Sequence, residues 1–337
     1  MNSVYLISSL GNYLFNTALG IVLIFIWSRF VDLQQILESL SKVNILYLGP
    51  IFLLLFLSPA IRAIRLKIFL AEIKKIKLLD LIFLNGAAMM LNFFIPIRAG
   101  EVAKGVYLNT HYSLTLGKAV VWVFIDRFVD FLVVLLLAAV LFFVVPTSLS
   151  ITFITIIIII LTLALFLTYL LIFQASFAKK LFNLLRHLLI VPSIKIYFDR
   201  FTAFILESFS ILNRHPKDLG LMMGVTILAY CVDAAIWYFS FLALGVSQDY
   251  FKMYLGQMLS ALTYLIPAAP GYIGSAEASG LLVLSGVFGI QPNLASAMIV
   301  LFHITSAVFI LIFGLISIYS LKINIGSLLR RVLGKAN

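Results

Sequence analysis

Apolar runs of about 20 residues recur along this chain, and they restrict its fold more than any other feature. Runs of this length are what helices need to cross a membrane. Only 11% of the 337 residues are charged, whereas soluble domains carry about 25%. The sequence therefore predicts an all-α, polytopic membrane protein forming one integral membrane domain over residues 1–337. We expect six full spans, near residues 8–28, 44–61, 118–145, 149–173, 219–245 and 294–320.

Most of the basic residues lie beside these spans, in the ranges 62–77, 179–217 and 322–335. The positive-inside rule places such clusters in the cytoplasm, so an even number of crossings must separate each cluster from the next. Both termini are then predicted to be cytoplasmic, in a multi-pass protein of the plasma membrane. The net charge of +11 indicates contact with anionic lipids at the cytoplasmic surface, and not with nucleic acid.

Two further apolar segments, 80–108 and 251–289, are interrupted by Pro and Gly near their middle. Because the full spans already supply two crossings in each interval, each segment must add none or two. Their halves are short for upright spans. We therefore expect two re-entrant hairpins of broken helices that enter the membrane from opposite sides.

The two hairpins resemble each other in sequence. Ile95-Pro96 is followed by a glycine and a glutamate, and so is Ile266-Pro267. Paired broken helices in the two halves of a transporter indicate its binding site, and opposite entry predicts an inverted repeat. Chance recurrence of Ile-Pro before glycine is the alternative. The expected parts are a first half at 1–173, an amphipathic cytoplasmic connector at 174–217, a second half at 218–321 and a basic cytoplasmic tail at 322–337.

The first hairpin carries charges at its break. Arg98, Glu101 and Lys104 would each cost about 2.5–3.5 kcal/mol in a membrane core, so they need partners or water. A helix broken at such a depth must face protein or a wet cavity. We therefore predict a substrate cavity here, formed by these charges and Asn92, with hinges at Pro96 and Gly100.

A second group of charges, Asp126, Arg127 and Asp130, lies in the third full span. The two aspartates are four residues apart on one helix face, where like charges repel, so a cation should lie between them. Arg98 and Lys104 are the best candidates for that cation. Arg127 points about 100° away from Asp126 and is expected to serve another partner. A structural ion-pair network and direct substrate contact remain equal, compatible interpretations.

The second hairpin places hinges at Pro267 and Pro270 before a half-helix that carries Glu277. Gly271 and Gly274 would permit a tight turn whose backbone donors favour a phosphate. Glu277 is expected to pair with Arg127 or Arg98, or to titrate if a proton drives transport. The alternative is a packing loop whose glycines allow helices to approach closely.

Two polar residues stand alone in the later spans. Asp233 is a secondary site candidate, because an intramembrane Asp is either functional or bonded to a neighbouring helix. For His303, a hydrogen-bonded core histidine is favoured over a ligand. No spacing of His, Asp and Glu predicts a metal site, and no Gly-rich loop predicts nucleotide hydrolysis, so no cofactor is expected.

At these residues the sequence resembles the lysylphosphatidylglycerol synthase transmembrane-region family, which includes the flippase portion of the multiple peptide resistance factor and stand-alone relatives. The resemblance extends from the first spans to about Tyr319, and this chain has Asp126 where family members usually carry Glu. We expect no soluble aminoacyltransferase domain after the last span, so lysyl transfer is not carried over. The residues that carry the resemblance are Asn92, Pro96, Arg98, Gly100, Glu101, Arg127, Asp130, Pro267, Pro270, Gly271, Gly274 and Glu277.

The resemblance implies movement of an amphipathic lipid between leaflets. The lipid would be an anionic or aminoacylated phospholipid or a polyprenyl-phosphate-linked sugar, and we expect no enzyme activity. The alternatives are a membrane transferase with Asp126 or Glu101 as general base, and a non-catalytic lipid-binding scaffold. A second copy of the chain and a lipid-synthesising enzyme are the candidate protein partners.

Overall fold

The computed structural model describes residues 17–71, 75–95, 99–114, 116–263 and 269–323, and these residues are helical wherever they form regular structure. Five described helices are long and apolar enough to cross a membrane. A sixth crossing results if the helix Thr17–Ser28 and α2 (Leu33–Ser41), which meet at a bend of 88°, are counted together. The prediction of an all-α polytopic membrane protein is confirmed.

The long helices agree with the expected spans within a few residues at most ends. They are α3 (Leu48–Leu70), which follows the short 3₁₀ helix η1 (Ile45–Tyr47), α6 (Leu116–Val144), α7 (Ile151–Phe173), α10 (Pro216–Ala243) and α13 (Pro292–Ser320). The exception is α3, which runs nine residues beyond the expected end at residue 61. Arg62 and Arg65 therefore lie inside a helix, and the prediction that they belong to a loop is wrong.

The segment 80–108 forms a broken helix, as expected. It consists of α4 (Leu78–Phe94) and α5 (Ala99–Tyr112), which pack against each other. Asn92 bridges the break, because its side-chain oxygen accepts a hydrogen bond of 2.8 Å from the backbone N–H of Gly100. The expected hinge at Pro96 and the candidate Arg98 lie outside the described residues.

The segment 251–289 is broken as well. It comprises α11 (Tyr250–Thr263), the 3₁₀ turn η2 (Pro270–Tyr272), α12 (Ser275–Leu281) and the π-helical turn η3 (Leu282–Val287). Gly271 and Gly274 have φ angles of 71° and 82°, which only glycine adopts readily. The predicted glycine turn is confirmed, whereas the hinge Pro267 lies outside the described residues.

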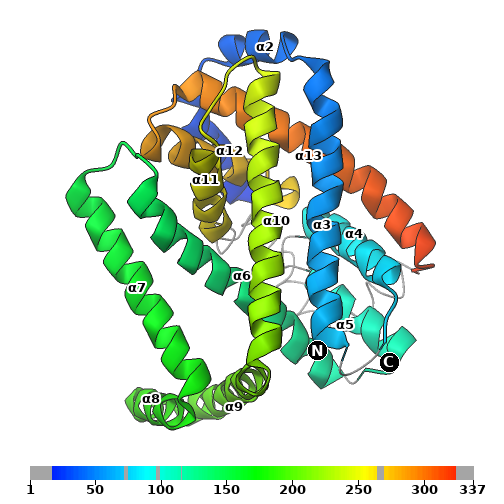
Figure 1. Cartoon of the computed structure of the whole chain (residues 1–337), viewed down its shortest axis with the longest axis vertical. Helices are drawn as coiled ribbons and strands as arrows, with labels where there is room; N and C mark the ends of the chain where they lie inside the picture. Colours follow the sequence, from blue (N-terminus) through cyan, green and yellow to red (C-terminus); the bar gives the residue numbers. More distant parts are fainter. Residues whose placement is uncertain (1–16, 72–74, 96–98, 115, 264–268, 324–337) are drawn as a thin grey trace.

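The two broken helices enter from opposite ends of the molecule and meet near its middle. In Figure 1, α5 lies low and α4 near the middle, whereas α11 and α12 lie in the upper half. The full-length helices alternate in direction: α3, α7 and α13 descend, and α6 and α10 ascend. Each broken helix therefore returns the chain to the side on which it entered, as the distribution of basic residues predicts. The division into two repeat halves stays a prediction.

Small residues allow the helices around the centre to approach closely, as is common in membrane proteins. Helices α3 and α10 lie side by side along most of their length (Figure 1). Helix α4 packs on α13 at two glycines: Gly86 faces Ser317 and Phe313, and Gly314 faces Met90.

A methyl group at the first broken helix would disturb this packing. A Cβ at Gly100 would lie 2.0 Å from the carbonyl oxygen of Ala88 in α4, so the backbone must shift. We expect Gly100→Ala to lower the free energy of unfolding by roughly 1–3 kcal/mol, measured by thermal or denaturant unfolding in detergent. Gly224→Ala is the control, because nothing lies within 4 Å of a Cβ there. Equal stability of the two variants would contradict the close packing of α4 on α5.

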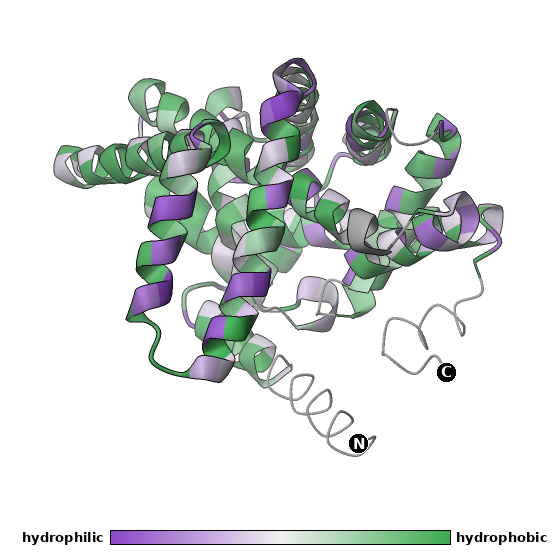
Figure 2. Ribbon diagram, turned by 90° about the horizontal axis from the view of Figure 1, so that it is seen from below, coloured by the Kyte–Doolittle hydropathy of each residue, from purple (hydrophilic) through white to green (hydrophobic). Residues whose placement is uncertain are grey.

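Helices α8 (Ala175–Leu188) and α9 (Pro192–Arg214) form the expected connector. Seen from below in Figure 2, hydrophilic residues recur along this end of the molecule between hydrophobic ones. Ile205, Phe209 and Leu212 of α9 pack into a core with α6. An ion pair of 2.7 Å between Arg186 and Asp199 joins α8 to α9. The cytoplasmic position of the connector stays a prediction.

Candidate functional site

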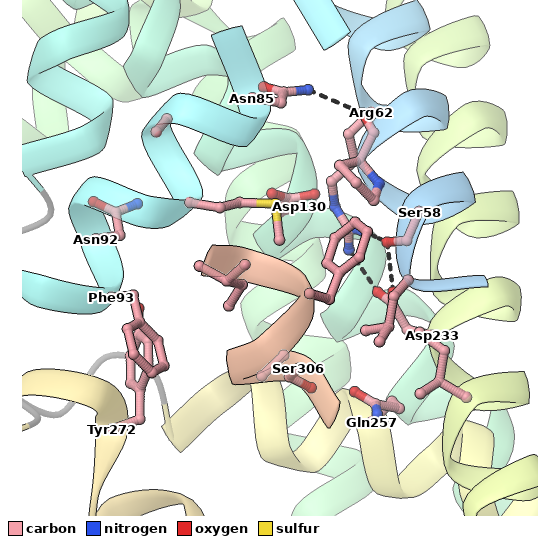
Figure 3. Close-up of a pocket in the computed structure, with 18 of the residues that line it drawn as sticks. Ser58, Arg62, Asn85, Asn92, Phe93, Asp130, Asp233, Gln257, Tyr272 and Ser306 are labelled. Carbon is pink, nitrogen blue, oxygen red and sulfur yellow. Dashed lines mark hydrogen bonds and ion pairs between the residues drawn. The ribbon is translucent and has the colours of Figure 1, made fainter. Parts of the chain in front are cut away.

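A cavity of about 380 Å³, named the polar cavity for the charged side chains in its wall, lies among the two broken helices and α3, α6, α10 and α13. Figure 3 shows side chains from several of these elements pointing into it. Its charged lining comes mainly from α3, α5, α6 and α10, and its aromatic lining from Phe93, Tyr230, Tyr272, Phe302 and Phe309. The charged residues that line it are Arg62, Glu101, Lys104, Asp126, Arg127, Asp130 and Asp233.

The cation between the two aspartates of α6 is Arg65. Its side chain is 1% exposed, lies 2.7 Å from Asp126 and also pairs with Asp130. A further hydrogen bond of 2.9 Å joins it to Thr226 of α10. The prediction that a cation lies between the two aspartates is confirmed, but the prediction that Lys104 is this cation is wrong. Arg98, the other candidate, lies outside the described residues.

The helical angle between Arg127 and Asp126 predicted that Arg127 would point away from this aspartate. The structure shows that it does not. Its long side chain folds back to pair with Asp126 at 2.7 Å and Asp130 at 3.1 Å, and it approaches Glu101 of α5 at 3.9 Å. Glu101 also lies 3.4 Å from Lys104. The first broken helix is thus held against α6 by an ion-pair network. This is the structural one of the two interpretations that the sequence left open. Because the Arg127 side chain is 36% exposed, it is also the most accessible cation of this network.

A second ion pair joins α3 to α10 in the wall of the cavity. Arg62 lies 2.7 Å from Asp233, and Ser58 donates a 2.6 Å hydrogen bond to the same carboxylate. The interaction is visible in Figure 3. Asp233 is therefore neither isolated nor peripheral. Sequence reasoning missed Arg62 and Arg65. Their signal was a helical spacing, because Arg62 follows Ser58 by four residues and Arg65 follows Arg62 by three, which places all of them on one face of α3.

The charges of the cavity wall occur as pairs. Buried charges are tolerated in a membrane only when partners replace the lost water, and each carboxylate that lines the cavity has an arginine or lysine beside it. A ligand with a phosphate would therefore share cations with carboxylates. Among the described residues, the Nε atom of Arg127 is buried without a hydrogen-bond acceptor, so the network has donor capacity left.

Glu277 pairs with His303 of α13, so the prediction that it pairs with Arg127 is wrong, whereas the prediction of a hydrogen-bonded core histidine at His303 is confirmed. The Glu277 carboxylate lies 2.5 Å from Nδ1 of His303, and Nε2 of His303 lies 2.7 Å from the carbonyl oxygen of Gly271. As expected of a core histidine, both ring nitrogens have partners. Glu277 also accepts a 2.8 Å hydrogen bond from the backbone N–H of Gly274. This donor, expected to face a phosphate, is therefore already engaged.

A second, mostly apolar cavity of about 470 Å³ adjoins the first. Phe93 and His303 line both cavities. The second cavity opens beside side chains that are about half exposed, including Ile273 at 55% and Ile304 at 54%. The rest of its lining is Phe94, Pro270, Gly271, Glu277, Val300 and Ala307.

The structure thus gathers most of the predicted site residues. Asn92 and the acidic and basic residues of α5, α6 and α10 line the polar cavity, whereas Pro270, Gly271 and Glu277 line the apolar one. Gly274 packs instead against Gly20 of the first helix, where an added Cβ would lie 2.2 Å from the carbonyl oxygen. Within the described part of the chain, no group of three His, Cys, Asp or Glu could hold a metal ion.

A family model described as the lysylphosphatidylglycerol synthase TM region matches residues 13–314. The match includes both broken helices and every residue of the two cavities. No curated protein matches the chain.

Proposed function

Because this chain belongs to the lysylphosphatidylglycerol synthase transmembrane-region family, we propose that it is a flippase, which moves a phosphate-bearing lipid between the two leaflets. The observation that carries this proposal is a polar, ion-paired cavity of about 380 Å³ between two opposed broken helices of a membrane protein. A lipid headgroup needs such a polar route, because crossing the hydrocarbon core without one costs several kcal/mol per unpaired polar group.

Arg127 is the proposed first contact of the phosphate. Its side chain is the most exposed cation of the network, and its planar guanidinium suits phosphate oxygens. Lys104 lies on the same network through Glu101. Asp126 and Asp130 position Arg127, Asp233 positions Arg62, and Asn92 holds the break between α4 and α5.

The adjoining apolar cavity supports an amphipathic substrate. A lipid in the polar cavity must leave its chains in hydrocarbon, and the apolar cavity begins where the polar one ends, at Phe93 and His303. We propose an anionic or aminoacylated phospholipid or a polyprenyl-phosphate-linked lipid as substrate. Opening and closing would follow if one broken helix moved against the other.

We further propose that the protein resides in the plasma membrane with both termini in the cytoplasm. The support is the clustering of basic residues at one end, where α3 ends and α8 and α9 lie (Figure 1). Anionic lipids would contact this basic end. A second copy of the chain or a lipid-synthesising enzyme is the proposed protein partner.

We propose transport without covalent chemistry. A transferase would use Asp126 or Glu101 as general base, but Asp126 pairs with Arg65 and Arg127, and Glu101 lies between Arg127 and Lys104. A carboxylate held between cations is a poor proton acceptor. Formation of a chemically modified lipid by the purified protein would favour the transferase over the flippase.

Reconstitution tests the proposal directly. Native mass spectrometry of the purified protein identifies the lipid that copurifies, and a fluorescent analogue of that lipid is then placed in proteoliposomes. Accessibility of the analogue to a membrane-impermeant quencher measures translocation. We expect faster translocation than in protein-free vesicles, whereas stoichiometric binding without translocation would identify a scaffold.

A further inference from the structure

The turn that breaks the second helix is held in a strained conformation. Tyr272 has a φ angle of 58°, between Gly271 at 71° and Gly274 at 82°. A tyrosine is disfavoured in this left-handed region and persists there only when its surroundings enforce it. The turn therefore depends on the contacts that hold its two ends.

Glu277 and His303 contribute a side-chain contact at each end, beside the hydrogen bond of 2.9 Å that the Ser275 hydroxyl donates to the Tyr272 carbonyl oxygen. His303 reaches the Gly271 carbonyl oxygen at one end of the turn, at 2.7 Å. Glu277 accepts the Gly274 N–H at the other end, at 2.8 Å. Nδ1 of His303 lies 2.5 Å from the Glu277 carboxylate. The His303 side chain is only 17% exposed and the Glu277 side chain only 9%. The pair thus closes a ring of hydrogen bonds around the turn.

The hydrogen bonds of this ring fix its proton content. Both ring nitrogens of His303 face oxygen acceptors, a carboxylate at Nδ1 and a carbonyl at Nε2. A neutral imidazole next to a carboxylate ion has one N–H and can satisfy only one of them. The pair therefore holds one additional proton, either on Nδ1 or on the carboxyl group. In both cases the pair as a whole is neutral.

Loss of that proton would release one side of the ring. The remaining N–H of His303 would serve either Glu277 or Gly271, and the other contact would become a repulsion between two lone pairs. A net negative charge would also remain on a pair that is mostly buried in a membrane protein, which is unfavourable. The strained turn then loses one of the contacts that hold its ends.

The turn contributes directly to the wall of the cavity. The Tyr272 ring faces Phe93 of the first broken helix, with ring centroids 6.4 Å apart (Figure 3). His303 itself lines both cavities. A movement of the turn would therefore alter the contact between the two broken helices at the place where the polar cavity meets the apolar one.

On the basis of the proposed flippase function, we propose that Glu277 and His303 form a proton-binding site whose occupancy holds this turn, and that the proton is the coupling ion for translocation. The proton exchanges with water through the polar cavity. The other titratable or charged groups in that cavity are Arg62 of α3, Glu101 and Lys104 of α5, Asp126, Arg127 and Asp130 of α6, Tyr230 and Asp233 of α10, and Tyr272 of η2.

The first experiment detects the proton without any transport assay. His111, His187 and His215 are replaced so that His303 is the only histidine, and its two ring nitrogens are observed by nitrogen-15 NMR in lipid. We expect both nitrogens, or one nitrogen and the Glu277 carboxyl group seen by infrared spectroscopy, to carry protons at pH 7. A deprotonated nitrogen opposite an ionised Glu277 would overturn the proton site.

The second experiment measures coupling in proteoliposomes with a gradient of one pH unit. For one proton per lipid, such a gradient should bias the lipid distribution about tenfold in the full-length protein. We expect His303→Asn and Glu277→Gln to abolish this bias, whereas His187→Asn on the exposed surface of α8 retains it. Glu277→Gln keeps the shape of the side chain and thereby tests coupling if the histidine variant fails to fold.

The outcomes separate this inference from the function on which it rests. Translocation that is independent of the gradient in the unaltered protein would overturn proton coupling and leave the flippase intact. Absence of translocation under every condition would remove the flippase and the coupling together. The NMR result would still decide whether the proton site exists.

Discussion

Arg65→Met will lower the free energy of unfolding by about 3–5 kcal/mol, the largest loss of stability expected from a single substitution in this protein. Arg65 is 1% exposed and neutralises both Asp126 and Asp130. Its removal leaves two carboxylates one helical turn apart with only the partly exposed Arg127 to serve them. Methionine keeps the unbranched apolar stem of arginine without its charge, so the effect reports mainly the lost charge.

Thermal unfolding in detergent, followed by size-exclusion chromatography, measures this effect. Lys67→Met on the same helix is the control, because Lys67 is exposed and makes no ion pair within the described structure. Adding Asp126→Asn and Asp130→Asn to Arg65→Met should restore part of the lost stability, since no uncompensated charge remains. Equal stability of Arg65→Met and Lys67→Met would contradict the central role of this cation.

The architecture could be predicted from the sequence because a membrane leaves the backbone few choices. Apolar length identifies the spans, Pro and Gly identify the breaks, and the distribution of Lys and Arg determines which way each segment runs. The end of α3 could not be predicted in this way. A basic residue in the last turns of a buried helix has the same sequence signature as one in a loop, and Arg62 and Arg65 were therefore placed outside the membrane.

The candidate site could be predicted in part. Charged residues within apolar segments had to gather around a polar space, so Glu101, Asp126 and Asp130 were identified correctly as neighbours of a cavity. Their partners depend on how helices distant in sequence pack. Glu277 and His303 are 26 residues apart on different helices, and only the folded structure brings them together. An unpaired Glu and an isolated His in consecutive membrane segments were the only signal.

Arg127→Gln is expected to reduce translocation by roughly 10–150-fold while the protein remains folded. This range corresponds to the loss of about 1.5–3 kcal/mol from one charged hydrogen bond to the phosphate. The stability cost is smaller than at Arg65, because Arg65 still neutralises Asp126 and Asp130 and the Arg127 side chain is already 36% exposed.

The quencher assay described above measures the effect on initial rates, with Arg186→Gln in the exposed connector as the matched control. Arg127→Lys separates charge from geometry, because lysine keeps the positive charge but lacks the planar guanidinium that binds two phosphate oxygens. An intermediate rate for Arg127→Lys would indicate that the phosphate is held by paired donors. Translocation at the unaltered rate in Arg127→Gln would show that the headgroup takes a route other than the cavity between the two broken helices.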